Sequence, residues 1–174
     1  AGGVGGAGDV VAGGDGWADR VRVVLVAAVS TGEAVRVRYP DAVRPWQHVL
    51  DCLNGYVDLT DALLVGESSG EAFNFGPDTG SFVSVRTLAT AVASLWGTES
   101  VIEVDEGAHV HEAMTLSLDS RKAELVLGWR NRMPFHDALA WTVAWEKEVR
   151  AGEDARAVTV GQIREFDRLP EVQR

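Results

Sequence analysis

The chain has 174 residues, of which 46% are hydrophobic and 24% charged, the composition of an ordinary globular chain able to bury one core. Its formal net charge at pH 7 is −10, and because binding to a nucleic-acid backbone requires a basic face, this charge argues against a nucleic-acid partner. The single cysteine, Cys52, excludes an intramolecular disulfide bond and is typical of a reducing compartment. No apolar run approaches the roughly 20 residues that cross a bilayer. We therefore expect a soluble, cytoplasmic protein without a membrane partner.

The glycines between Gly3 and Gly8 follow the spacing of a dinucleotide-binding fingerprint. That fingerprint requires a strand before the turn and a helix after it. Here only two residues precede it, and residues 9–14 do not have the pattern of a helix start. We therefore expect no cofactor site in this segment, but a Gly-rich terminus over residues 1–8 that leads into a short buried strand at Val10 and Val11.

The rest of the chain alternates apolar patterns of helical period with short β-type runs. The expected elements are a helix over 17–30, a strand over 35–38, a turn at 44–46, a helix over 49–64, a strand over 72–75, a helix over 84–96, an edge strand over 101–104, a helix over 119–128, a helix after 134 and a tail helix over 158–169. We expect Leu53, Val57 and Leu64 to face inward on the second helix. On the helix after Pro134, the inward stripe is expected to be Ala138, Trp141, Trp145 and Val149. The fold class is therefore α/β, a single helix-rich lobe over 1–174 with a few short strands.

Arginines near the second predicted strand form the strongest candidate for a ligand site. Val35-Arg36-Val37-Arg38 alternates apolar and cationic residues, so a strand places both arginines on one face and both valines on the other. Arg44 follows a few residues later, before Pro45. Arginine suits bidentate contacts to phosphate or carboxylate groups. We predict that Arg36, Arg38 and Arg44 converge on one anion; the alternative is a solvated strand face followed by a proline turn.

The residues after Arg44 each allow two interpretations. Trp46 could stack on a base or a sugar as part of a substrate site, or it could anchor the core behind the proline turn. His48 and Asp51 stand at the start of a predicted helix, where polar side chains cap the helix or orient a loop, so we do not interpret His48 as a catalytic base. Cys52, on an apolar helix face, is expected to be an inert buried thiol.

A second group of polar residues resembles a metal-ligand cluster. It consists of His109, His111 and Glu112. Two histidines at i and i+2 without other convergent ligands do not define a metal site, because a protein-bound metal needs three or four converging ligands. We therefore predict no metal site.

Several segments, taken together in order and spacing, resemble CDP-glucose 4,6-dehydratases, which are extended short-chain dehydrogenase/reductases. The segments are 8–20, 41–51 (Asp-Ala-Val-Arg-Pro-Trp-Gln-His-Val-Leu-Asp), 73–77 (Phe-Asn-Phe-Gly-Pro), 111–113, 118–123 and 127–130 (Leu-Gly-Trp-Arg). The Asn-Phe-Gly-Pro and Leu-Gly-Trp elements are common to nucleotide-sugar epimerases and dehydratases. The run over 41–49 is the one that narrows the resemblance to the CDP-glucose branch. The likeness extends from about Gly8 to about Ile163.

The resemblance implies the C-terminal substrate-binding lobe of an extended Rossmann-type dehydratase. In that family NAD takes a hydride from C4 of the hexose, water is lost across C5 and C6, and the hydride returns to C6. The cofactor would belong to the other half of the enzyme, so no cofactor is expected to bind this chain alone. The implied partners are a nucleotide-sugar substrate, an upstream Rossmann domain and a second copy of the enzyme.

The resemblance also assigns substrate-binding residues. Arg44 corresponds to an arginine that contacts the sugar-nucleotide pyrophosphate, and Arg20 lies beside the glycine-containing loop at 13–16. Asp9 stands where the family has an asparagine that donates to a substrate phosphate. A carboxylate offers no amide donor and repels a diphosphate, so this departure places substrate affinity in doubt.

The family's catalytic pair, a tyrosine followed four residues later by lysine, has no counterpart in the sequence. Tyr39 and Tyr56 are followed at that spacing by Val43 and Thr60. We therefore expect no catalytic residue and no activity from this chain alone. Two alternatives stay open: the substrate lobe of another epimerase or dehydratase of the GDP-mannose type, and a non-catalytic remnant or binding module.

Overall fold

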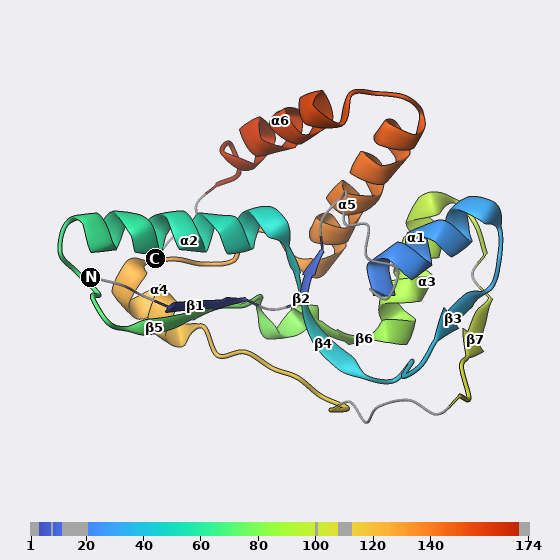
Figure 1. The fold of residues 1–174 in the computed structure, drawn as a ribbon, viewed down its shortest axis with the longest axis horizontal. Coiled ribbons are helices and arrows are strands. Elements are labelled where there is room, and N and C mark those ends of the chain that lie inside the picture. Colours follow the sequence, from blue (N-terminus) through green and yellow to red (C-terminus); the bar gives the residue numbers. More distant parts are fainter. Residues whose placement is uncertain (1–3, 8, 12–20, 100, 108–112, 171–174) are drawn as a thin grey trace.

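The computed structural model describes residues 4–7, 9–11, 21–99, 101–107 and 113–170 (Figure 1). In these residues the helices are α1 (Val21–Thr31), α2 (Val49–Leu64), α3 (Val85–Trp96), α4 (Arg121–Leu127), α5 (Phe135–Arg150) and α6 (Ala155–Phe166), with a 3₁₀ turn η1 (Thr79–Ser81). The strands are β1 (Val4–Ala7), β2 (Asp9–Val11), β3 (Val35–Val37), β4 (Val43–His48), β5 (Ala72–Phe75), β6 (Phe82–Ser84) and β7 (Ile102–Val104). The helix-rich α/β class expected from the sequence is confirmed. No helix in the described part of the chain has the length and apolarity of a membrane span.

The strands form three small sheets rather than one large sheet. β1 pairs with β5 and β3 pairs with β7, both in parallel. In the third sheet β4 lies between β2, which is parallel to it, and β6, which is antiparallel. Figure 1 shows β1 and β5 below α2 at one end of the molecule, and β3 and β7 below α1 at the other end. β4 connects the two ends and carries the candidate arginine, Arg44.

Each end has its own hydrophobic cluster, and the two clusters differ in size. We call the larger one the main core; its members come from α1, β3, β4, α3 and α5 and are Leu25, Ala28, Val29, Val35, Val37, Trp46, Leu88, Ala89, Val92, Ala93, Phe135, Leu139 and Val143. We call the smaller one the β5 core; its members are Leu59, Phe73, Phe75, Ala123 and Trp129. A third cluster of Met133, Ala138 and Phe166 fixes α6 against α5.

The helix α2 has the limits that the sequence predicts, but it buries a different face. His48 caps its N-terminus, because the imidazole Nδ1 accepts a hydrogen bond from the Leu50 N–H at 3.3 Å. The predicted inward residues Leu53, Val57 and Leu64 are 47%, 57% and 80% exposed, so this prediction is wrong. The buried face instead carries Asp51, Cys52, Gly55 and Leu59. The apolar pattern is ambiguous because the helix has hydrophobic residues on two flanks.

Gly55 explains why this face of α2 packs against β5. A Cβ at Gly55 would meet the ring of Phe75 on β5 at 2.4 Å, so only a residue without a side chain allows the helix to approach the strand this closely. Phe75 then packs edge to face against Trp129, at 5.2 Å between ring centroids. The close contact between α2 and β5 thus depends on one small residue that a hydrophobic pattern does not reveal.

The expected turn at 44–46 is wrong, because these residues lie inside strand β4. The β6 ladder covers Val43 to Pro45, and the β2 ladder begins at Trp46. Val43 also bridges Thr115 on its other side, but the named strands β6 and β2 cover different halves of β4, and Pro45 pairs with β6 alone. A position with one neighbouring strand is a setting in which proline is tolerated. The Gly-rich segment also differs from expectation, since residues 4–7 form strand β1, while the strand expected at Val10 and Val11 is present as β2.

The remaining elements agree with the sequence except at their ends and on one helix face. β5 has the predicted limits, and Ser84 caps α3 by accepting a hydrogen bond from the Thr87 N–H at 3.1 Å. α4 begins two residues later than expected, and Gly128 adopts the expected left-handed conformation after it, with φ 72°. On α5 the main core takes Phe135, Leu139 and Val143; of the predicted stripe only Ala138 is fully buried. The part of the first predicted helix before Val21 lies outside the described residues.

Candidate functional site

Strand β4 is unusual because its polar side chains are buried. Arg44, Gln47 and His48 are 7%, 1% and 2% exposed. Burying such groups is unfavourable unless they are hydrogen-bonded, so a strand of this kind needs partners from several elements. The Arg44 guanidinium donates to the carbonyl oxygen of Val43 at 3.0 Å. β4 therefore positions an arginine and an imidazole within the protein rather than on a solvated face.

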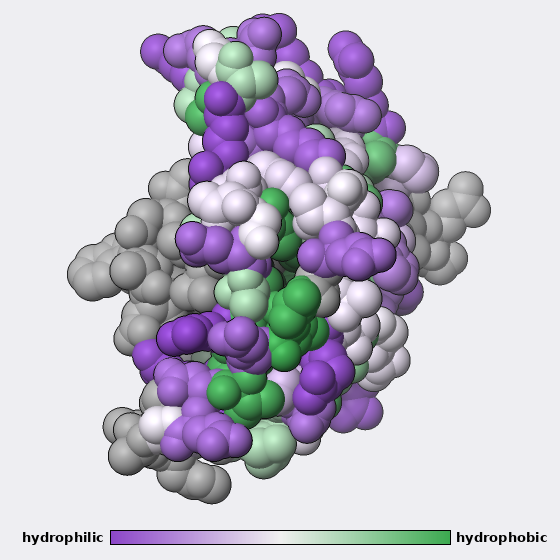
Figure 2. Space-filling model, turned by 90° about the vertical axis from the view of Figure 1, so that its right-hand side faces the viewer, coloured by the Kyte–Doolittle hydropathy of each residue, from purple (hydrophilic) through white to green (hydrophobic). Residues whose placement is uncertain are grey.

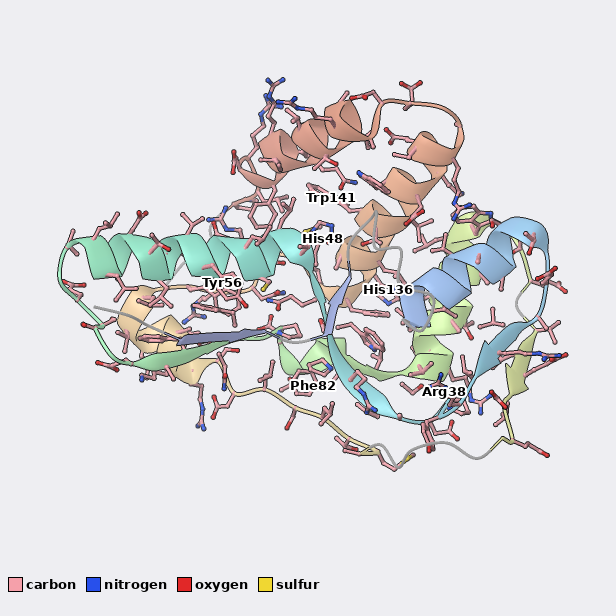
Figure 3. The ribbon with its side chains drawn as sticks, viewed as in Figure 1. Arg38, His48, Tyr56, Phe82, His136 and Trp141 are labelled. Carbon is pink, nitrogen blue, oxygen red and sulfur yellow. The ribbon has the colours of Figure 1, made fainter. Side chains whose placement is uncertain are left out.

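The three candidate arginines are in different environments. The predicted alternation on β3 is confirmed, since Val35 and Val37 are buried and Arg36 is exposed. Arg36 points to solvent and forms an ion pair with Glu103 on β7, at 3.2 Å between Nε and Oε2. Arg38 is also exposed and follows β3 at the end of the molecule that holds α3 (Figure 3). The structure does not bring Arg36 to the buried position of Arg44, so the convergence of all three on one anion finds no support in this arrangement.

The surface around Arg36 is exposed to solvent and largely hydrophilic. Figure 2 shows this side of the molecule, with hydrophilic side chains on both sides of a narrow hydrophobic band. On β7 and just before it, Val104 and Val101 are 49% and 62% exposed. A charged pair between two neighbouring strands discourages further strand pairing and suits a solvent-facing sheet.

Trp46 is a core residue in this structure. It is 5% exposed, belongs to the main core, and its indole Nε1 donates to the carbonyl oxygen of Val83 at 3.0 Å. A stacking platform for a base or sugar needs an accessible ring face. The core interpretation of Trp46 is therefore the one that the packing supports, and the stacking role has no accessible surface here.

Several candidate residues fall outside the part of the chain that can be assessed. Asp9 lies on β2 opposite Trp46 on β4, but its side chain is outside the described residues. Arg20 and the cluster of His109, His111 and Glu112 are outside them as well. Among the described residues, no group of three or more histidine, cysteine, aspartate or glutamate side chains is arranged to hold a metal ion.

A buried polar network joins the start of α2 to residues 129–133. The carboxylate of Asp51 accepts hydrogen bonds from the backbone N–H groups of Arg132 at 2.7 Å and Met133 at 3.2 Å. The indole of Trp129 donates to the Asp51 carbonyl oxygen at 3.2 Å. Nearby, the Gln47 amide lies 3.5 Å from the Asn131 side-chain oxygen. The interpretation that polar residues here orient a loop is thus confirmed.

Burial shifts the pKa values of Asp51 and His48 in opposite directions. Desolvation raises the pKa of Asp51 to about 6, although the backbone hydrogen bonds from Arg132 and Met133 lower it. Desolvation lowers the pKa of His48 to about 4. The ring of His48 packs edge to face on Trp141 of α5, at 5.9 Å between centroids (Figure 3). A neutral imidazole that caps a helix and contacts an indole is a positioning group, not an available base.

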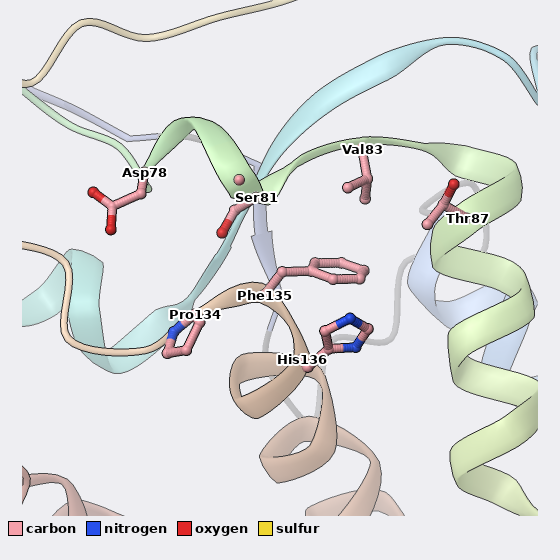
Figure 4. A pocket seen from close by; sticks show the side chains of 8 residues that line it. Asp78, Ser81, Val83, Thr87, Pro134, Phe135 and His136 are labelled. Carbon is pink, nitrogen blue, oxygen red and sulfur yellow. The ribbon is translucent and has the colours of Figure 1, made fainter.

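A hollow of about 300 Å³ lies between the start of α3 and the start of α5 (Figure 4). Its lining consists of Asp78, Gly80, Ser81, Val83, Thr87, Pro134, Phe135 and His136. The ring of Phe135 forms an apolar wall, while hydroxyl, carboxylate and imidazole groups supply hydrogen-bonding partners. This volume is at the lower limit of ligand pockets, so it suits one part of a larger ligand.

The hollow and the arginine strand are neighbours. Val83, which lines the hollow, pairs with Arg44 in the antiparallel ladder between β6 and β4. Sequence reasoning missed Ser81, Thr87 and His136. The available signal was positional: Ser81 and Thr87 lie between the end of β5 and the first turn of α3, and His136 lies at the start of α5. Ligand sites of α/β folds commonly lie beyond the carboxyl ends of strands.

The fold is that of extended dehydratases and epimerases of nucleotide sugars. The structure superimposes on dTDP-glucose 4,6-dehydratase from Bacillus anthracis, solved in complex with NAD, with a TM-score of 0.72 and 17% identity over 90% of this chain and 47% of that one. It also superimposes on MoeE5, solved with UDP-glucose and NAD, with a TM-score of 0.73 and 24% identity over 85% and 48% of the two chains. At these identities the likeness shows the fold alone.

The sequence itself is similar to one particular enzyme of this kind. It is 34% identical to CDP-glucose 4,6-dehydratase of Salmonella typhimurium over 161 residues, which is 92% of this chain and 45% of that protein. This similarity confirms the resemblance predicted from the motifs. No model of a protein family matches the chain. The chain spans about half the length of the proteins it matches.

Proposed function

We propose that this chain is a single substrate-binding lobe of a sugar-nucleotide 4,6-dehydratase of the CDP-glucose type. The observation that carries the proposal is the 34% identity to a CDP-glucose 4,6-dehydratase over 92% of the chain. The hollow beside β6 supports it, because a cavity with an apolar wall and the two hydroxyl groups of Ser81 and Thr87 suits part of a sugar nucleotide. On this proposal Arg44 contacts the pyrophosphate of the substrate.

The lobe acts only together with an NAD-binding half. The glycines that resemble a dinucleotide fingerprint lie in and around strand β1, and the next described element is another strand, β2. A pyrophosphate cradle requires a glycine turn that opens a helix, so these residues do not fit NAD. Hydride transfer and acid–base catalysis are therefore assigned to the other half, and the isolated chain is expected to be inactive.

Binding measurements test the substrate class directly. Calorimetric titration of the purified chain with CDP-glucose, GDP-mannose, UDP-glucose and dTDP-glucose should show the tightest binding for CDP-glucose. Arg44→Ala should weaken that binding by about 10- to 100-fold, the effect expected for a lost charge-assisted hydrogen bond. Arg36→Ala is the matched control and should leave the affinity unchanged, because Arg36 pairs with Glu103 on the outer surface.

Catalysis is tested separately. Incubation of the chain with CDP-glucose and NAD should yield no 4-keto-6-deoxy sugar, and detection of that product would contradict the assignment of catalysis to another half. Preferential binding of GDP-mannose would instead favour the related dehydratase class.

A non-catalytic remnant is the second candidate, and the residue at position 9 favours it. Asp9 lies directly opposite Trp46, next to the Arg44 segment. A carboxylate close to a diphosphate reduces affinity by charge repulsion. Asp9→Asn should raise CDP-glucose affinity if the lobe binds substrate at this place; absence of heat from both variants with every nucleotide sugar would support the remnant.

A further inference from the structure

We propose that Asp51 is a positioning residue for ligand binding: its buried carboxylate holds segment 129–133 in the conformation that places Pro134, Phe135 and His136 along the wall of the hollow. The proposal rests on the proposed function, because that function assigns the hollow to part of a sugar nucleotide. Asp51 is not among the described residues that line the hollow. It therefore acts on the ligand through the backbone that it holds.

The Asp51 carboxylate binds two consecutive backbone groups in the interior of the protein. The residue is 0% exposed, and its two oxygens accept hydrogen bonds from the N–H groups of Arg132 at 2.7 Å and Met133 at 3.2 Å. An ionised carboxylate has two acceptor oxygens and satisfies both N–H groups, whereas a carboxamide or a protonated carboxyl group turns a donor toward one of them. The ionised form of Asp51 is therefore the one that matches the backbone of this segment.

The backbone that Asp51 holds leads directly into the hollow. Met133 immediately precedes Pro134, and Pro134, Phe135 and His136 line the hollow at the start of α5 (Figure 4). Proline at the N-cap of α5 has no side-chain acceptor, so the first turn of this helix takes its position from the segment before it. A displacement of the N–H groups that Asp51 binds is therefore passed on to the wall of the hollow.

The opposite side of the hollow also acts on Asp51. Burial raises the pKa of Asp51 to about 6, the backbone hydrogen bonds that it accepts and the charge of Arg132 lower it, and the charge of Asp78 raises it. Asp78 is exposed and lines the hollow. On α2 itself, the neighbouring titratable groups are His48 at the N-cap and Cys52. Asp51 therefore changes its ionisation in a pH range in which ligand binding can be measured.

Hydrogen exchange without ligand tests the positioning. In Asp51→Asn the amides of residues 132–137 should exchange about tenfold faster than in the unmodified protein, because one hydrogen bond to a charged acceptor is lost. Asp61→Asn is the matched control: it removes an exposed carboxylate from the same helix and should leave these amides unchanged. Circular dichroism has to show that both variants keep their helices. Unchanged protection of residues 132–137 in Asp51→Asn would overturn the proposal.

The unmodified protein supplies a test that does not depend on the folding of a variant. After correction for the intrinsic pH dependence of exchange, protection of residues 132–137 should fall as the pH is lowered from about 8 to about 5.5, because Asp51 takes up a proton over this range. The amides of α6 lie away from the Asp51 carboxylate and serve as the internal reference. Constant protection of residues 132–137 relative to α6 would also overturn the proposal.

Titration with CDP-glucose tests the consequence for binding. Asp51→Asn should bind CDP-glucose about tenfold more weakly than the unmodified protein at a pH of about 8, because the wall of the hollow is displaced. The ratio of the two affinities should shrink about threefold by a pH of about 5.5, since protonated Asp51 resembles asparagine. Titration of His136 affects both proteins and cancels from this ratio. A ratio that stays constant with pH would overturn the proposal, because general destabilisation by the substitution predicts no such decrease.

The two measurements also separate this inference from the proposed function. Faster exchange of residues 132–137 in Asp51→Asn, with no CDP-glucose binding by the unmodified protein, would contradict the proposed function alone. Equal CDP-glucose affinities of Asp51→Asn and the unmodified protein would contradict this inference alone.

Discussion

The two parallel strand pairs of this protein, β3–β7 and β1–β5, have the same topology but expose different kinds of side chain to solvent. The β3–β7 pair rests on the main core and shows solvent an ion pair between Arg36 and Glu103. The β1–β5 pair rests on the smaller β5 core, and its other face shows Ala72 and Asn74 to solvent. The first surface carries the exposed ion pair between Arg36 and Glu103, whereas the second has an uncharged strand face that is flanked by the ion pair between Lys122 and Glu71.

This difference goes together with the unequal sizes of the two cores beneath the strand pairs. The main core draws residues from α1, β3, β4, α3 and α5, so it closes on itself within the described chain. The β5 core has one strand, two helices and Trp129, so burial there is shared among few side chains. The main core therefore buries more side chains than the β5 core and should contribute more to the stability of the fold.

The largest expected effect comes from truncating the main core. Leu88→Ala removes a side chain that is 1% exposed, and the lost burial plus the cavity should lower the free energy of unfolding by about 3 kcal/mol. Leu64→Ala on α2, where the side chain is 80% exposed, should change it by less than about 0.5 kcal/mol. Urea denaturation followed by circular dichroism measures both. Equal losses would mean that Leu64 is buried in solution.

The contributions of Asp51 and His48 to the free energy of unfolding should depend on pH in opposite directions. Asp51 has a folded pKa of about 6 against an ordinary 3.8, so its contribution to stability is full below pH 3.8 and is lost as the pH rises through 6. His48 has a folded pKa of about 4 against 6.5, so its contribution is full above pH 6.5 and is lost as the pH falls toward 4. The two contributions have opposite slopes over nearly the same range and should largely cancel.

Asp51→Asn removes one side of this balance. The variant should lose stability as the pH falls from 6.5 to 4, by up to about 3 kcal/mol, because protonation of His48 then acts alone. Urea midpoints at several pH values measure the slope for the variant and for the unmodified protein. Parallel pH profiles for the two proteins would show that the pKa of Asp51 is not raised in the folded protein.

A smaller effect is expected where α2 meets β5. In Gly55→Ala the added Cβ meets Phe75 at 2.4 Å, and this overpacking should outweigh the helix propensity of alanine, for a net loss of about 1 kcal/mol. Gly161→Ala on α6 is the matched control, because nothing lies within 4 Å of its Cβ, and it should be stabilising by up to about 1 kcal/mol. Thermal unfolding of both variants checks the sign. A stabilising Gly55→Ala would mean that Phe75 can move aside easily.

Much of the fold follows from local patterns in the sequence, and the site does not. Residues 49–64 and 72–75 have the predicted limits because helix-period spacing, a capping residue and flanking glycines act locally. Strand β4 was missed because its proline and polar residues are typical of a turn, and only the neighbours β2 and β6 make it a strand. The hollow at Ser81 and His136 was missed for the same reason, since residues 55 positions apart meet only after the fold forms.

Finally, the smallest expected effect tests whether the outer face of the β3–β7 pair is exposed to solvent. Arg36 and Glu103 are exposed, with side chains 78% and 49% accessible, so their ion pair should contribute less than about 0.5 kcal/mol to folding. Glu103→Gln should therefore barely change the urea midpoint, and the small change should vanish at high salt. A change of more than about 1 kcal/mol in Glu103→Gln would mean that the ion pair is shielded from solvent, and it would contradict the assignment of this strand pair to the exposed surface.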